Sequence, residues 1–151
     1  MNFGFTSGKT KKTGPSKKWT EREIDAKIKE FDQKIAEAKE REGDVEVRDA
    51  MIDKAEWIKD EARDFPHAER IFREAYAMTG GASRKMEILF EILLMSFEKQ
   101  DLNSISKDIA TCHKLVEEGA IFYTTSDTET IVQLIAKSKR PKTIDKVVDA
   151  I

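Results

Sequence analysis

The sequence has 151 residues, enough for one domain with a hydrophobic core; 37% of them are charged and 39% hydrophobic. Its 27 basic and 29 acidic residues give a net charge of -2, which argues against a protein that binds nucleic acid through its whole surface. A single cysteine excludes a disulfide framework, and the longest apolar run, around residues 88–95, is too short to span a membrane.

The first 19 residues predict a disordered basic leader, because they are rich in Gly, Ser, Thr and Lys. They contain GFTSGKT, which approaches the phosphate-binding loop pattern but leaves three residues instead of four after its first glycine. No apolar strand precedes this segment, so we expect no nucleotide binding there. The lysines of the leader are expected to be solvated: Lys9, Lys11, Lys12, Lys17 and Lys18.

A long first helix is predicted between Thr20 and Gly43. Thr20 and Glu23 have the spacing of a capping box. Apolar residues then recur every three or four positions over residues 24–38, which is the pattern of one helical stripe. Because this stripe is narrow, we expect it to pack as an arm or to associate with a second copy as a coiled-coil-like pair.

Four further helices are predicted, and a proline or glycines mark most of the breaks around them. The fourth helix of the five is apolar on nearly all sides, which predicts burial between layers. Gly119 is the expected C-cap of the last one. The approximate ranges are 45–62, 66–78, 83–100 and 104–118, with Pro66 in the first turn of the second range. The core is expected to centre on Phe72, Leu89, Phe90, Leu93, Leu94 and Phe97.

Helices of this length joined by short turns favour antiparallel hairpins. The predicted fold class is therefore mainly all-α, with TPR-like or solenoid-like hairpins after a long N-terminal helix. After Gly119 the segment AIFYTT predicts a short strand near residues 121–124, and two helices are expected to follow. We divide the chain into a leader (1–19), a helical scaffold domain (20–119) and a C-terminal tail (120–151).

Four blocks of the scaffold domain carry a family resemblance: EVRDAMIDKAEWI, AERIFREAY, LFEILLMSFEKQDL and LVEEG. In this order and spacing, over residues 24–119, they resemble the N-terminal helical part of the proteasome non-ATPase regulatory subunit 6 family, lid subunits of the PCI type. The resemblance implies a non-catalytic scaffold without cofactors, located in the cytoplasm, the nucleus or both, whose partners are proteasome lid subunits. The sequence ends before the region that would correspond to the winged-helix PCI module, so we expect that module to be lacking.

Residues 117–151 resemble a different family, through EEGAIFYTTSDTETIVQLIAKSK and IDKVVDAI. They are similar to a segment of the glutaminase domain of amidophosphoribosyltransferase, an enzyme of purine synthesis. This resemblance implies that Ser126 and Asp127 bind substrate, with the aspartate holding the α-amino group of glutamine. A helix cap is the competing role for both residues, and we favour it. The alternative function is thus an amidotransferase fragment without its catalytic cysteine.

The remaining candidates for chemistry are one cysteine and two histidines. Cys112 lies on the apolar face of its predicted helix, and His113 points at least about a quarter-turn away from it, so a core cysteine is expected. His67 beside Pro66 is expected to be exposed. Neither histidine has a carboxylate or thiolate at ligand spacing, so we predict no metal site. No catalytic residue is predicted, and neither nucleic acid nor membrane is expected as a partner.

Overall fold

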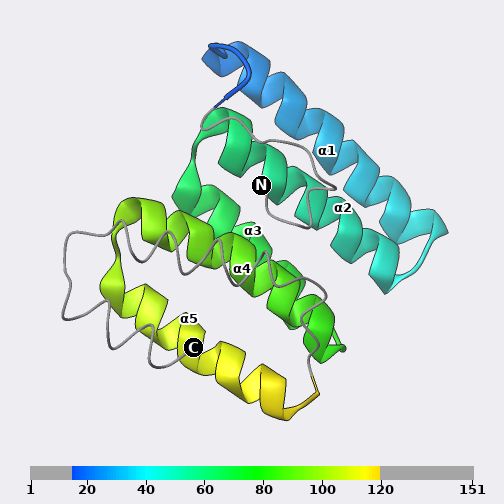
Figure 1. Cartoon of the computed structure of the whole chain (residues 1–151). Helices are drawn as coiled ribbons and strands as arrows, with labels where there is room; N and C mark the ends of the chain where they lie inside the picture. Colours follow the sequence, from blue (N-terminus) through cyan, green and yellow to red (C-terminus); the bar gives the residue numbers. More distant parts are fainter. Residues whose placement is uncertain (1–14, 120–151) are drawn as a thin grey trace. The chain divides into compact units, whose positions relative to one another are not determined.

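The computed structural model describes residues 15–119, which form helices and no strand (Figure 1). This confirms the all-α fold class, whereas the strand expected near residues 121–124 lies outside the described residues. The helices divide between two compact units, with α1, α2, η2 and α3 in one and α4 and α5 in the other. None of these helices is both long and apolar enough to cross a bilayer. Their bounds are α1 Glu21–Arg41, α2 Asp44–Trp57, η2 Ile58–Ala62, α3 Phe65–Ala77, α4 Ala82–Lys99 and α5 Leu102–Glu117.

The predicted capping box starts α1. The backbone N–H of Glu23 donates to Thr20 Oγ1 at 3.2 Å, and the backbone N–H of Thr20 donates to Glu23 Oε1 at 3.0 Å. These two bonds satisfy backbone donors that a helix start otherwise leaves without partners. After α1, the Gly43 N–H donates to Glu46 Oε1 at 3.1 Å and helps to start α2. The chain therefore turns back within two residues.

The apolar stripe of α1 lies against α2, which runs antiparallel to α1 (Figure 1). The Phe31 ring is 6.1 Å from the Trp57 ring, centroid to centroid, and Lys54 Nζ lies 2.6 Å from Asp32 Oδ1. A helix of the same chain thus occupies the stripe of residues 24–38. Self-association through these residues stays a prediction, and a second copy would have to compete with α2.

The last turn of the second predicted helix widens into the π-helical η2. The chain leaves η2 through Arg63, whose φ of 57° is left-handed, and the Asp64 N–H donates to Ile58 O at 3.3 Å. A π-turn takes more residues per turn than an α-helix, and such turns occur frequently at functional sites. Glu61, which belongs to this turn, is the contact point of the N-terminal segment described below.

A carboxylate cap starts α3, and its apolar face is buried. The His67 N–H donates to Asp64 Oδ1 at 3.3 Å, and Pro66 lies in the first turn as predicted. At the other end of the helix, Thr79 Oγ1 donates to Ala75 O at 2.8 Å. The buried face comprises Phe65, Ala68, Ile71, Phe72 and Ala75.

Helices α4 and α5 pack against each other as a hairpin in the other unit. Of the six predicted core residues, Phe72 on α3 and Leu89, Phe90 and Leu93 on α4 are buried. Leu94 and Phe97 are only half-buried, so that part of the prediction was wrong. Because they are three positions apart, they share one narrow side of α4, and that side retains solvent exposure. The C-cap residue of α5 is Glu118, and the glycine predicted to end this helix, Gly119, follows it with a left-handed φ of 102°.

Asp101 caps α5, and replacing it with alanine is expected to lower the free energy of unfolding by about 0.5–2 kcal/mol at neutral pH. Its Oδ1 accepts from the Ser104 N–H at 3.2 Å and its Oδ2 from Ser104 Oγ at 2.8 Å. The Ser104 side chain and then its backbone N–H lower the pKa of Asp101 below the ordinary 3.8. The contribution is therefore complete above that value and is lost as the pH falls through the lowered pKa.

Urea unfolding followed by circular dichroism at several pH values measures this effect. Asp101→Asn is the matched control, because asparagine caps helices without a titrating group. Its stability should stay close to that of the natural chain at pH 7, and this one contribution to the pH dependence should disappear. An Asp101→Ala chain as stable as the natural one at pH 7 would show that the cap contributes nothing.

Candidate interaction surfaces

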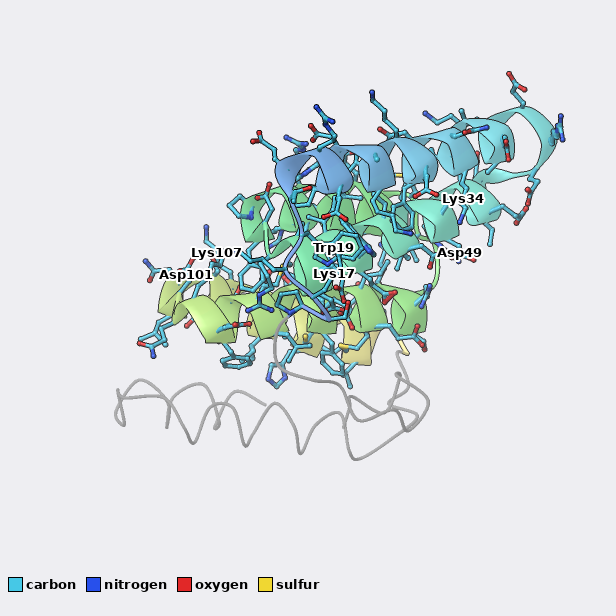
Figure 2. All side chains as sticks on the ribbon, turned by 90° about the horizontal axis from the view of Figure 1, so that it is seen from above. Lys17, Trp19, Lys34, Asp49, Asp101 and Lys107 are labelled. Atoms are coloured by element: carbon cyan, nitrogen blue, oxygen red, sulfur yellow. The ribbon has the colours of Figure 1, made fainter. Side chains whose placement is uncertain are left out.

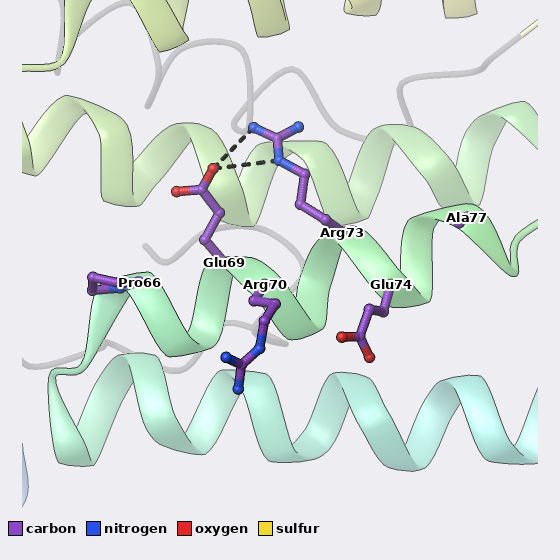
Figure 3. A pocket seen from close by; sticks show the side chains of 6 residues that line it. All are labelled: Pro66, Glu69, Arg70, Arg73, Glu74 and Ala77. Carbon is purple, nitrogen blue, oxygen red and sulfur yellow. Dashed lines mark hydrogen bonds and ion pairs between the residues drawn. The ribbon is translucent and has the colours of Figure 1, made fainter.

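A shallow, open groove follows the outer face of α3 (Figure 3). The residues that line it recur every three or four positions, so they form one stripe along the helix. This stripe is distinct from the apolar face that buries Ile71 and Phe72. The lining residues are Pro66, Glu69, Arg70, Arg73, Glu74 and Ala77.

Two acidic and two basic side chains line this α3 groove, in the chain order Glu69, Arg70, Arg73 and Glu74. Arg73 donates from Nε at 3.3 Å and from Nη2 at 3.1 Å to Glu69 Oε2. Arg70 and Glu74 extend to the other side of the helix from that pair (Figure 3). Because both signs are interleaved, the groove offers no uniform positive field to a phosphate backbone, and it suits a protein surface with charges of both signs.

A second feature is the strap, residues Pro15–Trp19, which precedes α1 and reaches η2. Three donors of the strap converge on one oxygen, Glu61 Oε1. The Ser16 N–H lies 2.9 Å from it, Ser16 Oγ 2.7 Å and Trp19 Nε1 2.8 Å. Hydrogen bonds to an ionised acceptor are stronger than neutral ones. This carboxylate therefore anchors the strap.

Aromatic contacts reinforce the strap. The Trp19 and Trp57 rings meet edge to face, with centroids 5.1 Å apart and planes at 76°. Lys17, labelled beside Trp19 in Figure 2, places its Nζ 4.4 Å from the Trp19 ring centroid and 2.7 Å from Glu23 Oε2. The strap is thus held by an indole contact as well as by Glu61.

The electrostatics keep both carboxylates of the strap region ionised. Burial raises the pKa of Glu61, but the hydrogen bonds from Ser16 and Trp19 outweigh it, and the pKa lies below the ordinary 4.5 even with Asp60 alongside. Hydrogen bonds from Lys17 and then from the backbone and side chain of Thr20 lower the pKa of Glu23 to about 2. The strap is consequently held by charge-assisted bonds at neutral pH.

Glu61→Ala is expected to detach the strap. The Ser16 amide should then exchange its hydrogen about tenfold faster, since a hydrogen bond to a charged group contributes about 1.5–3 kcal/mol and 1.4 kcal/mol corresponds to a factor of ten. Hydrogen exchange read by mass spectrometry measures this, and Glu40→Ala on the exposed face of α1 is the matched control. Unchanged exchange over residues 16–20 would mean that Glu61 does not hold the strap.

Comparison with protein-family models matches residues 16–139 to the family described as 26S proteasome subunit RPN7. The chain belongs to this RPN7 family. The α3 groove, the α4–α5 hairpin and all of the strap after Pro15 lie within the matched residues. A comparison with curated proteins finds no match.

The RPN7 match confirms the resemblance to a proteasome lid subunit predicted from the four sequence blocks. It continues beyond residue 119, so it includes part of the tail whose sequence is similar to the amidotransferase domain. Ser126 and Asp127 fall within the match but lie outside the described residues. Their assignment to substrate binding stays a prediction.

Residues 15–119 contain two kinds of candidate residue, possible metal ligands and the single cysteine. No group of three or more His, Cys, Asp or Glu side chains there could hold a metal ion. Burial, followed by the nearby Asp108 charge, raises the pKa of Cys112 to about 12, which leaves a thiol instead of a reactive thiolate at neutral pH. Cys112 is nevertheless only half-buried, so the prediction of a core position for it was wrong, and His113 is exposed.

His67 differs from its prediction, because it is half-buried and not exposed. Its Nδ1 lies 3.8 Å from Asp64 Oδ2, the carboxylate that caps α3. Burial and then the Arg70 charge lower its pKa below 6.5. The His67 imidazole in the first turn of α3 is therefore neutral at neutral pH.

The strap corrects the predicted leader. Residues 15–19 were expected to belong to a disordered segment, but Ser16 and Trp19 bind Glu61. Lys17 and Lys18 are exposed, and Lys17 also pairs with Glu23. A tryptophan directly before a capping box was the available signal for an anchored segment. No local pattern pointed to Glu61 as the anchor.

Proposed function

We propose that this chain is a non-catalytic scaffold module of the proteasome regulatory-particle lid, which binds other lid subunits through its helical surface. The observation that carries the proposal is the RPN7 family match over residues 16–139. Antiparallel helices of the kind seen in residues 15–119 support it, because such hairpins present extended surfaces to protein partners. We place the protein in the cytoplasm, the nucleus or both.

The α3 groove is the surface that we assign to a lid partner. Its opposite Arg70 and Glu74 charges, beside the Glu69–Arg73 pair, would meet a partner surface with charges in the reverse order. Such complementarity favours the correct partner and register, since like charges brought together cost several kcal/mol. A partner of this kind would be a lid subunit that presents a helix or loop of mixed charge.

Capture of lid subunits from cell extract, quantified by mass spectrometry, tests the proposal. A tagged chain should enrich proteasome lid subunits over a scrambled control. Exchanging the two charges, with Arg70→Glu and Glu74→Arg together, keeps the net charge and should reduce the capture at least severalfold. The matched control exchanges two opposite charges that are also four positions apart, Asp25→Lys and Lys29→Asp on α1, both at exposed positions. No enrichment of lid subunits would remove the scaffold proposal, and an equal loss in both exchanges would remove the groove.

The amidotransferase fragment remains the alternative, and it rests on residues 117–151 alone. It predicts that the chain binds glutamine, whereas the scaffold proposal predicts no such binding. Binding that is lost in Asp127→Ala would favour the fragment, because this aspartate is the residue that the resemblance implies for holding the α-amino group. Binding that is unchanged in the variant would not involve this aspartate.

A further inference from the structure

The hydroxyl group of Ser16 is an accessible part of the strap. Ser16 is exposed and lies before α1 in a stretch without helix or strand. Its Oγ donates to Glu61 Oε1 at 2.7 Å, and its backbone N–H donates to the same oxygen at 2.9 Å. A negative charge on this hydroxyl would reverse the sign of its interaction with the carboxylate.

We propose that Ser16 is a phosphorylation site, and that a phosphate there releases the strap from Glu61 and uncovers the Trp57 ring. The inference goes beyond the scaffold role and rests on the geometry of the strap, not on the proposed function. Its two parts are the recognition of Ser16 by a kinase and the release of the strap, and each has its own test.

The surroundings of Ser16 suit a kinase with an acidic peptide-binding groove. Lys17 and Lys18 follow Ser16 directly and are both exposed, and the sequence has Lys11 and Lys12 shortly before it. Basic residues on both sides of a serine favour binding to an acidic groove by charge complementarity. The strap has no ladder or helix bonds to break, so a local opening is enough to present it.

The reaction transfers one phosphoryl group from a nucleoside triphosphate. A bond forms between Ser16 Oγ and the γ-phosphorus, while the bond from that phosphorus to the β,γ-bridging oxygen breaks. The nucleoside diphosphate leaves, and the hydroxyl proton passes to the catalytic base of the kinase. Ser16 thereby loses the O–H donor that it offered to Glu61.

The phosphate would meet a negative site. It carries a charge of about -1.5 to -2 at neutral pH, against the ionised Glu61 and with Asp60 alongside. Lys17 already pairs with Glu23 at 2.7 Å and lies over the Trp19 ring. An attraction between the phosphate and this lysine would have to compete with these two contacts.

Release of Ser16 leaves Trp19 to hold the strap against Glu61 and Trp57, beside the Lys17–Glu23 pair. Its Nε1 bond to Glu61, at 2.8 Å, and its contact with Trp57 would then have to hold the segment without the two Ser16 bonds. When Trp19 leaves, the Trp57 ring loses the edge-to-face partner 5.1 Å away and keeps its contact with Phe31. The modification thus exposes an indole beside a carboxylate.

Recognition is tested on the full chain with magnesium ATP and the catalytic domain of a serine kinase that prefers basic peptides. Peptide mapping by mass spectrometry should find phosphate on Ser16, and Ser16→Ala should remove that peptide signal while other sites remain. Absence of phosphate from Ser16 under conditions that fully label a basic serine peptide would overturn the modification site.

Release is tested on the full chain with phosphoserine encoded at position 16. The amides of residues 16–20 should exchange about tenfold faster than in the unmodified chain, since the Ser16 bonds to a charged acceptor are lost. The emission of the chain's two tryptophans should shift to longer wavelength as their rings meet water. Phosphoserine at position 106, an exposed serine of α5, is the matched control and should change neither signal. Unchanged exchange at residues 16–20, or the same change in the control, would overturn the release.

The Glu61→Gln chain separates charge repulsion from simple crowding. Its amide nitrogen can donate to a phosphate oxygen, so phosphoserine at position 16 should loosen the strap less in this chain than opposite glutamate. If phosphoserine at position 16 raises the exchange of residues 16–20 equally in the Glu61 chain and in the Glu61→Gln chain, charge repulsion by Glu61 is not the cause of the release.

Discussion

Replacing Phe72 with alanine is expected to lower the free energy of unfolding by about 3–5 kcal/mol. The Phe72 side chain has 0% exposed surface and lies in the middle of α3. Ala68 and Ala75, on the same buried face, have no side-chain length to fill the space that a removed ring leaves. The cost includes both the lost burial and the cavity, and it is large against the 5–15 kcal/mol or so by which domains are stable.

Urea unfolding followed by circular dichroism measures this loss. Met78→Ala, next to the end of the same helix and 40% exposed, is the matched control and should change the stability by no more than about 0.5 kcal/mol. Phe72→Leu should fall between them, because it keeps part of the buried volume. A loss below about 1 kcal/mol for Phe72→Ala would mean that this side of α3 collapses around the missing ring.

The helices could be predicted from the sequence because their start and stop signals are local. The capping box of Thr20 and Glu23 starts α1, Pro66 stands in the first turn of α3, and Gly119 follows α5 with the left-handed backbone that favours glycine. Each signal acts through neighbours within a few positions. The all-α class follows from such signals without any knowledge of tertiary packing.

Burial on α4 shows where local reasoning stops. The sequence of α4 is apolar on nearly all sides, so it predicted Leu93, Leu94 and Phe97 equally as core residues. Leu93 is buried, while Leu94 and Phe97 are half-buried. Which side of such a helix keeps solvent contact depends on the elements packed against it, and the helical period alone carries no information about them.

The two candidate surfaces, the α3 groove and the strap, differ in how much of each could be predicted from the sequence. The opposite charges of the α3 groove are visible in the sequence, but Arg70 and Glu74 read like any solvated face until the groove is seen. The strap depends on a contact between Ser16 and Glu61, which are 45 positions apart. No sequence pattern in either segment predicts a contact with the other, so the anchoring of the strap could be found only from the structure.

Replacing Leu93 with alanine is expected to lower the free energy of unfolding by about 2–5 kcal/mol. Leu93 is 1% exposed and lies among buried residues of α4 that include Leu89, Phe90 and Ile92. A loss of 2 kcal/mol, the lower end of this range, corresponds to about a 25-fold rise in the hydrogen-exchange rate of the most protected α4 amides. Val116→Ala on α5, a residue with 45% exposure, is the matched control and should leave that exchange unchanged.

The pattern of exchange in the Leu93→Ala chain also reports on how the two compact units unfold. If the amides of α4 and α5 speed up while those of α1 to α3 keep their rates, the α4–α5 unit opens as a foldon of its own. If all five helices speed up by one factor, the described chain unfolds as a single cooperative body, and a core defect in α4 weakens the strap and the α3 groove as well. Unchanged exchange in every helix would show that the side chain of Leu93 contributes little to the core, against the burial seen in the structure.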